Sequence, residues 1–282
     1  MAIDVRPHGR VGVEITGVDL GNLNEADFAE IHAAFADHGV VYFRDQAIDE
    51  DQHIAFARRL GPININRFFA VHPRYPEIAL VLKEPQQREN IGGGWHTDHS
   101  YDAEPALGSV LVARELPPQG GATAFASMYA AYDALPDDLR ARVDGARAVH
   151  SARHVFGSKS SAYAGARETH GDGRIGNSAA ADVLDDVVHP VVITHPLSGK
   201  RAIYVNPGFT TAIVGLEPEE SRELLQALYA HCLDPRFQEA FHWQSGSIAL
   251  WDNRATWHYA HNDYHGHRRE MHRITIGGEA LN

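Results

Sequence analysis

The sequence predicts a mainly β protein with helical decoration, built on a jelly-roll core, which is also called a double-stranded β-helix. Strand-like segments dominate from residue 78 to the end of the chain. Helical periodicity is confined to residues 24–61 and to two later segments. The chain of 282 residues has no internal repeat and no low-complexity linker, so we expect one domain over residues 1–282.

The front of the chain alternates strands with helices. Residues 12–18 alternate polar with apolar side chains between glycines, a pattern typical of a strand. Residues 24–39 predict a helix, because an asparagine can cap its start and a glycine can end it. A strand of the buried type at residues 40–44 and a second helix over residues 49–61 complete this part.

The rest of the chain is strand-rich. We expect strands at residues 78–82, 109–116, 123–126, 188–194, 201–206, 247–252, 256–260 and 272–277. Two helical segments interrupt them, one over residues 127–145 with a break at Pro136 and one over residues 217–233. Residues 157–187 are rich in Gly, Ser, Ala and Asp with little periodicity, and they predict a flap over the active site.

Composition excludes several classes of protein. The 25 basic and 37 acidic residues give a net charge of −12 at pH 7, which argues against nucleic-acid binding. An anionic ligand must therefore be held by locally placed arginines. The single cysteine, Cys232, cannot form an intramolecular disulfide, and no apolar run is long enough for a membrane span or a signal peptide. We expect a cytoplasmic protein and a homo-oligomer.

The motif His96-Thr97-Asp98 follows three consecutive glycines. On an extended strand, His96 and Asp98 would present an imidazole and a carboxylate to the same side. Such a pair supplies two ligands of the 2-His-1-carboxylate triad that binds non-haem Fe(II). His-x-Asp alone is not specific, and a polar surface turn is the alternative. His258, between two aromatic residues on a predicted strand, offers the third ligand.

Two arginines follow His258 near the last predicted strand, one before its predicted start and one within it. Arg269 and Arg273 are four residues apart, so on a strand they share one face with Met271, while His272 faces the other side. Arginines that point inward are costly unless an anion pairs with them. The alternative is a surface pair bonded to acidic side chains, which this chain has in excess.

Taken together, these motifs resemble the taurine dioxygenase / 2,4-dichlorophenoxyacetate dioxygenase family of Fe(II)- and 2-oxoglutarate-dependent oxygenases. The resemblance runs nearly from end to end. Its most specific stretches are Trp95-His96-Thr97-Asp98, Gly120-Gly121-Ala122-Thr123, Val205-Asn206-Pro207-Gly208-Phe209, Trp251-Asp252-Asn253-Arg254, His258-Tyr259-Ala260 and Arg268-Arg269-Glu270-Met271-His272-Arg273.

The resemblance implies a set of roles. His96, Asp98 and His258 would bind iron, Thr123 and Arg269 would hold the distal carboxylate of 2-oxoglutarate, and Arg273 would meet an anionic substrate. By their spacing, four more residues would contact the substrate. These are His72, Tyr101, Phe156 and Phe209, of which Phe156 and Phe209 could equally be core residues.

The implied reaction consumes O₂ and 2-oxoglutarate and yields succinate and CO₂. The implied substrate is a small organic anion, namely a sulfonate, a sulfate ester, an aryloxyalkanoate or another carboxylate. Taurine-specific relatives carry an asparagine where this chain has Gly92, which argues against taurine itself. The competing hypothesis is a non-redox jelly-roll protein that binds a metal, either a hydrolase or a small-molecule binding module.

Overall fold

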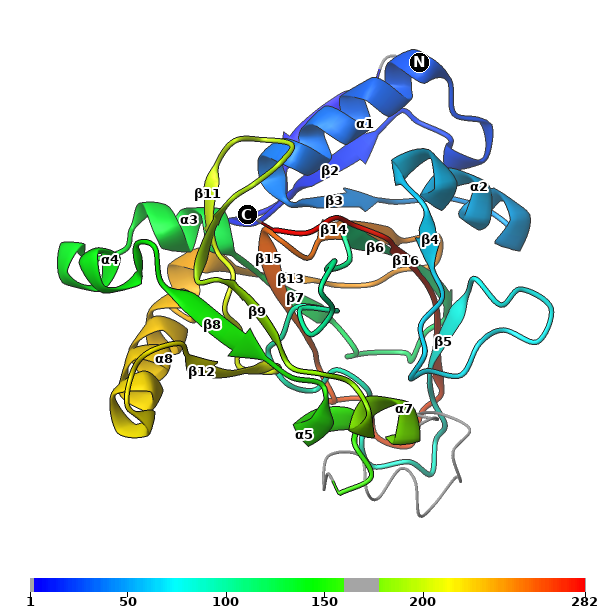
Figure 1. The fold of residues 1–282 in the computed structure, drawn as a ribbon. Helices are drawn as coiled ribbons and strands as arrows, with labels where there is room; N and C mark the ends of the chain where they lie inside the picture. The colour runs from blue at the N-terminus through cyan, green and yellow to red at the C-terminus, as the bar shows by residue number, and fades with distance from the viewer. Residues whose placement is uncertain (1–2, 160–177, 282) are drawn as a thin grey trace.

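Two sheets whose inner faces pack together form the centre of the protein (Figure 1). The structure, a computed structural model, describes residues 3–159 and 178–281. In this part of the chain the large sheet runs in the order β1 (Asp4–Pro7), β2 (Val13–Thr16), β3 (Val40–Phe43), β14 (Ile248–Asp252), β6 (Gly108–Glu115), β16 (Arg269–Ile276) and β4 (Ile63–Asn64), with β5 (Ala79–Lys83) also paired to β16. The small sheet runs in the order β13 (Gln238–Phe241), β7 (Thr123–Ser127) and β15 (Thr256–Ala260).

Successive strands alternate between the two sheets. β6 lies in the large sheet and β7 in the small one, and β13, β14, β15 and β16 then alternate from small to large. Phe125 and Phe241 of the small sheet meet Trp251 and Met271 of the large sheet in a shared core. This alternation is that of a jelly roll, so the predicted mainly β fold class is confirmed.

Helices α1 (Glu25–His38) and α2 (Glu50–Leu60) cover the outer face of the large sheet (Figure 1). The Asn24 side chain caps α1, and Gly39 ends it with a φ of 71°. A capping box between Asp49 and Gln52 starts α2. The predicted strand–helix–strand–helix order of this region is confirmed.

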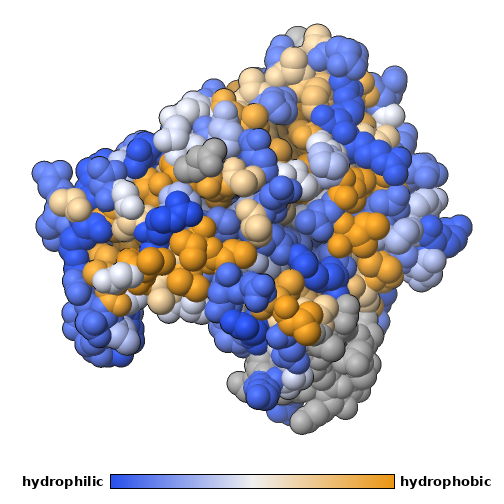
Figure 2. Space-filling view, viewed as in Figure 1, coloured by the Kyte–Doolittle hydropathy of each residue, from blue (hydrophilic) through white to orange (hydrophobic). Residues whose placement is uncertain are grey.

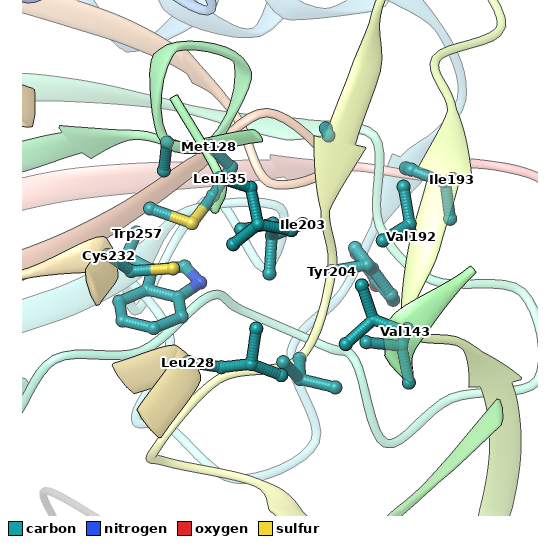
Figure 3. Close-up of a cluster of buried hydrophobic side chains, with 14 of the residues drawn as sticks. Met128, Leu135, Val143, Val192, Ile193, Ile203, Tyr204, Leu228, Cys232 and Trp257 are labelled. Atoms are coloured by element: carbon teal, nitrogen blue, oxygen red, sulfur yellow. The ribbon is translucent and has the colours of Figure 1, made fainter. Parts of the chain in front are cut away.

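A second hydrophobic core lies outside the small sheet. It is enclosed by α3 (Met128–Asp133), α4 (Asp137–Val143) and α8 (Pro218–Cys232), and Pro136 separates α3 from α4 as predicted. Cys232 of α8 lies beside Trp257 of β15 in this core (Figure 3). The remaining elements are β8 (Arg147–His150), β9 (Val187–Pro190), β10 (Val192–Thr194), β11 (Arg201–Ile203), β12 (Thr210–Ile213), α5 (Arg153–Phe156), α7 (Ser178–Asp182) and the 3₁₀ turns η1 (Leu20–Asn22) and η3 (Pro235–Phe237).

Two expectations differ from the structure, and a third falls largely outside the described residues. The strand predicted at residues 188–194 is two strands, because β9 pairs with β8 and only β10 pairs with β11. The last strand begins at Arg269, earlier than predicted, since charged residues at its start hid the strand pattern. The predicted flap at residues 157–187 falls largely on residues 160–177, which lie outside the described residues, and α7 forms part of the remainder.

The surface in Figure 2 carries several separate hydrophobic patches among hydrophilic residues. Within residues 3–159 and 178–281, the structure has no helix that is both long enough and apolar enough to cross a membrane.

Two buried histidines predict how stability depends on pH. Burial lowers the pKa of both His53 and His150 from 6.5 to about 3. Below pH 6.5 the unfolded chain therefore binds more protons than the folded chain, so stability falls as the pH drops from 6.5 towards 3. We expect His53→Leu to make the acid-induced loss shallower by up to about 1.4 kcal/mol per pH unit in denaturant titrations. The exposed His265, changed to Leu, is the control, and an equal pH slope in wild type and His53→Leu would contradict this prediction.

Candidate active site

The jelly roll brings His96, Asp98 and His258 together. His96 and His258 form an isolated antiparallel bridge, in which the His96 amide donates to the His258 carbonyl over 3.2 Å and the reverse bond measures 2.8 Å. Asp98 follows in a turn, so the expected extended strand is reduced to this single bridge. One ligand atom from each of the three side chains lies within 4.8 Å of the other two. This spacing suits three ligands of one metal ion.

The protonation state of the three side chains also suits a metal. Burial lowers the pKa of the His96 and His258 imidazoles, so both are neutral near pH 7. Burial opposes ionisation of Asp98, but the positive charge of Arg273 favours it, and the pKa of the carboxyl is lowered overall. His96 Nδ1 lies 2.7 Å from the Gly94 carbonyl and donates to it, which leaves Nε2 free as a ligand atom.

Arg269 of β16 is a buried cation with donor atoms available for an anion. The residue is 4% exposed, and its Nε and Nη2 find no hydrogen-bond partner among the described residues. Burial lowers the pKa of its guanidinium. Thr123 lines the same cavity, and Trp243 Nε1 donates to its hydroxyl over 3.0 Å. Since that bond occupies the oxygen as an acceptor, the Thr123 hydroxyl is left to donate its own hydrogen to a ligand.

The Arg273 side chain contacts the triad and also lines the cavity. Its Nη1 donates to Asp98 Oδ2 over 3.1 Å, while Nε and Nη2 have no partner among the described residues. Its guanidinium carbon lies 4.8 Å from the centre of the Phe69 ring. Arg273 thus contacts the carboxylate of Asp98, and two of its nitrogen atoms are available as donors on the cavity side.

A cavity of about 670 Å³ joins these groups. Its polar wall includes the triad, Thr123, Arg269 and Arg273. Its apolar wall is largely aromatic and aliphatic and includes Phe69, Val81, Ile91, Leu111, Val155, Phe156, Phe209 and Trp251. The cavity is therefore suited to an anion with an apolar body.

The four residues expected to contact substrate fall into two groups. Phe156 and Phe209 are buried and line the cavity, so they belong to the wall as well as the core. Tyr101 is not in the lining and packs behind Phe209, with ring centroids 4.7 Å apart.

The expectation for His72 does not fit this structure, because its ring is absent from the lining. It packs instead against Tyr75 and against His272, which points to the outer face of β16. Spacing along the sequence does not determine on which side of β5 the preceding turn lies.

Sequence reasoning missed several residues that shape the site. Trp243 orients Thr123, and Phe69 covers Arg273. Gly208 lies so close to His96 that a Cβ at this position would be 2.6 Å from the His96 Cβ, which only glycine avoids. The stretch around Gly208 contributed to the resemblance, but its sequence gave no sign of this contact.

Comparison with known proteins places the chain in a family. Residues 4–275 match the model described as "Taurine catabolism dioxygenase TauD, TfdA family". An alpha-ketoglutarate-dependent sulfate ester dioxygenase from Pseudomonas putida is 34% identical over 99% of this chain and 91% of that protein. An (S)-phenoxypropionate/alpha-ketoglutarate-dioxygenase from Sphingobium herbicidovorans is 35% identical over 92% and 89%. A crystal structure of a taurine dioxygenase from Burkholderia xenovorans, 33% identical, aligns with a TM-score of 0.80 over 100% of this chain and 93% of that chain.

The chain belongs to the TauD, TfdA family of 2-oxoglutarate-dependent dioxygenases. It is an oxidoreductase that depends on Fe(II), 2-oxoglutarate and O₂, as the resemblance implied. The residues present fit Fe(II) and 2-oxoglutarate. The neutral imidazoles of His96 and His258 and the carboxylate of Asp98 suit Fe(II). The enclosed guanidinium of Arg269 suits a carboxylate of 2-oxoglutarate. The comparisons favour this class over a non-redox hydrolase or binding module.

Proposed function

We propose that His96, Asp98 and His258 bind the Fe(II), and that Arg269 and Thr123 bind the distal carboxylate of 2-oxoglutarate. The observation that carries the proposal is the enclosed guanidinium of Arg269, whose donors are unmatched on the cavity wall that also holds the triad. A carboxylate matches the planar fork of donors and supplies the missing charge. A hydrolase that acted through the triad alone would have no use for this arginine.

When bound, Fe(II) and 2-oxoglutarate allow O₂ to be split, so that one oxygen atom enters succinate, the other hydroxylates a C–H bond of the substrate, and CO₂ is released. The residues of the protein orient the metal ligands and shield the reacting atoms from water. The Gly94 carbonyl fixes the tautomer of His96, and Arg273 keeps Asp98 ionised and oriented. The aromatic wall around Phe156 and Phe209 excludes water from the reacting atoms.

The substrate we propose is an aryloxyalkanoate or a similar small carboxylate with an aromatic body. Nε and Nη2 of Arg273 would receive its carboxylate, and Phe69, Phe156 and Phe209 would pack against its ring. One similar relative acts, by its name, on phenoxypropionate. Gly92 at the cavity rim supplies no amide side chain for the amino group of taurine.

A sulfate ester is the second candidate, because a relative of similar identity is named for that substrate. We would test both classes by measuring succinate formed with aryloxyalkanoates such as 2,4-dichlorophenoxyacetate and with alkyl sulfates such as hexyl sulfate. We expect the aryloxyalkanoates to stimulate succinate formation more. Stronger stimulation by the alkyl sulfates would overturn the aromatic part of the proposal. The single domain over residues 1–282, the homo-oligomer and the cytoplasmic location belong to the proposal as further predictions.

Arg273→Ala tests the anion site. We expect substrate affinity to fall at least about thirtyfold, the equivalent of ~2 kcal/mol, because the substrate anion loses its counter-charge. Affinity for 2-oxoglutarate should change little, and less product should form per succinate, since an unanchored substrate is misplaced. Arg114, on the outer face of the same sheet and bonded to the Ile48 carbonyl, is the matched control when changed to Ala. Wild-type affinity and a wild-type product-to-succinate ratio in Arg273→Ala would make Arg273 a purely structural residue.

A further inference from the structure

The residue after Asp98 has an unusual backbone. His99 has a φ of 59°, and Asp45 is the one other non-glycine residue with positive φ in the described part of the chain. Residues with a Cβ rarely adopt this conformation, because the Cβ crowds a backbone oxygen. His99 is also only 1% exposed. Its neighbours must therefore hold the ring and the turn in place.

Two hydrogen bonds fix the His99 ring. Nδ1 lies 2.8 Å from Asp102 Oδ2, so Nδ1 carries the hydrogen and donates it to the carboxylate. Nε2 is then an acceptor, and Asn66 Nδ2 donates to it over 3.2 Å. Asp102 also forms an ion pair with Arg67. The turn that contains Asp98 is thus tied twice to the segment at residues 66–67.

Asn66 carries this link to the cavity wall. Its Oδ1 accepts hydrogen bonds from the backbone amides of Phe68, at 2.8 Å, and Phe69, at 3.2 Å. Phe69 lines the cavity and lies over the Arg273 guanidinium. Phe68 is fully buried and stacks on Phe156, another wall residue, with ring centroids 4.5 Å apart. The two polar atoms of the buried Asn66 side chain therefore link the cavity wall at Phe68 and Phe69 to the turn that contains Asp98.

We infer that Asn66 and His99 are positioning residues that couple the Asp98 turn to the Phe69 wall of the substrate cavity. His99 holds Asn66, and Asn66 sets the position of Phe69 over Arg273. Phe69 covers the arginine proposed to bind the anion, so its position determines how tightly a substrate is held. The inference rests on the proposed function. It assigns to Asn66 a role in substrate binding, separate from metal and 2-oxoglutarate binding.

The test starts from Asn66→Ala in the Fe(II)-loaded enzyme, with 2,4-dichlorophenoxyacetate as the probe, or hexyl sulfate if the wild type prefers it. We expect the KM for the probe to rise about tenfold, which is the size of effect expected when one buried hydrogen bond is lost. We also expect less product to form per succinate. Iron content and the dissociation constant of 2-oxoglutarate should stay as in wild type. The matched control is Asn24→Ala, which removes a side-chain bond to a backbone amide in the remote cap of α1. It should lower Tm and leave KM unchanged.

Two further variants separate positioning from simple loss of folding. Asn66→Asp keeps the acceptor for Phe68 and Phe69 but cannot donate to His99, so its KM should lie between those of wild type and Asn66→Ala. His99→Asn tolerates the left-handed backbone but is too short to reach Asn66, and it should raise KM in the same direction. Because both changes break one link, the double variant Asn66→Ala/His99→Asn should show less than the product of the two effects.

A wild-type KM and product-to-succinate ratio in Asn66→Ala would overturn the inference, as would independent effects in the double variant. These outcomes are distinct from failure of the proposed function. If the wild type forms succinate with neither probe, the anion site itself is wrong and the inference falls with it.

Discussion

Replacing Asp98 with alanine is expected to remove both iron binding and turnover. The substitution takes away the single anionic ligand and leaves Arg273 as an enclosed cation 3.1 Å from where the carboxylate was. An unpaired buried charge of this kind costs about 3–5 kcal/mol, and its positive sign also repels a divalent metal ion. We expect no stoichiometric iron in the purified variant and turnover lower by at least about three decades. Metal analysis of protein loaded with Fe(II) without oxygen is the measurement.

Asp252→Ala separates metal binding from stability. Asp252 is also a buried carboxylate, paired with Arg254 at 2.8 Å and with His195 at 2.9 Å, but it contributes no ligand atom to the triad. We expect it to lower Tm while the folded protein keeps its iron. If Asp98→Ala holds one iron per chain and turns over as wild type does, the triad assignment is wrong.

Replacing Arg269 with alanine is expected to weaken 2-oxoglutarate binding by about two to three decades. The distal carboxylate would lose the enclosed counter-charge of Arg269, at roughly 3–5 kcal/mol, and each ~1.4 kcal/mol corresponds to one decade in affinity. Activity should therefore recover in part at high 2-oxoglutarate concentration, and the KM for 2-oxoglutarate is the quantity to measure.

Arg268, the neighbouring arginine, provides the matched control for Arg269→Ala. Arg268 points away from the cavity and forms ion pairs with Glu84, Glu115 and Glu270. Arg268→Ala removes the same charge one residue away, so it should leave the KM for 2-oxoglutarate near its wild-type value. An equal KM in Arg269→Ala and Arg268→Ala would show that the general field, and not a specific contact, attracts the cosubstrate.

Local patterns in the sequence predicted the strand-rich fold and singled out the candidate site residues, whereas the roles of those residues came from the family resemblance. Alternation along β16 predicted that Arg269 and Arg273 share a face with Met271, and all three are buried on the side of the small sheet or the cavity. The ends of α1 and α2 were predictable because capping and glycine signals lie within a few residues of each end.

Contacts between segments far apart in the sequence were not predictable in the same way. Arg273 and Asp98 are 175 residues apart, and nothing in either motif reveals their ion pair. The bond from Trp243 to Thr123 spans 120 residues. His72 was assigned to the cavity by spacing alone, whereas the direction of the turn before β5 places it on the outer side. Such contacts depend on how the two sheets pack, which a one-dimensional pattern does not specify.

The central claim is that the triad and Arg269 form one joint site for Fe(II) and 2-oxoglutarate. Its most direct test is an anaerobic titration of the Fe(II)-loaded protein with 2-oxoglutarate, followed by visible absorption. The account predicts a weak charge-transfer band that saturates at one 2-oxoglutarate per chain and that requires far higher concentrations in Arg269→Ala. The absence of a band in the wild type, or an identical midpoint in Arg269→Ala, would contradict it.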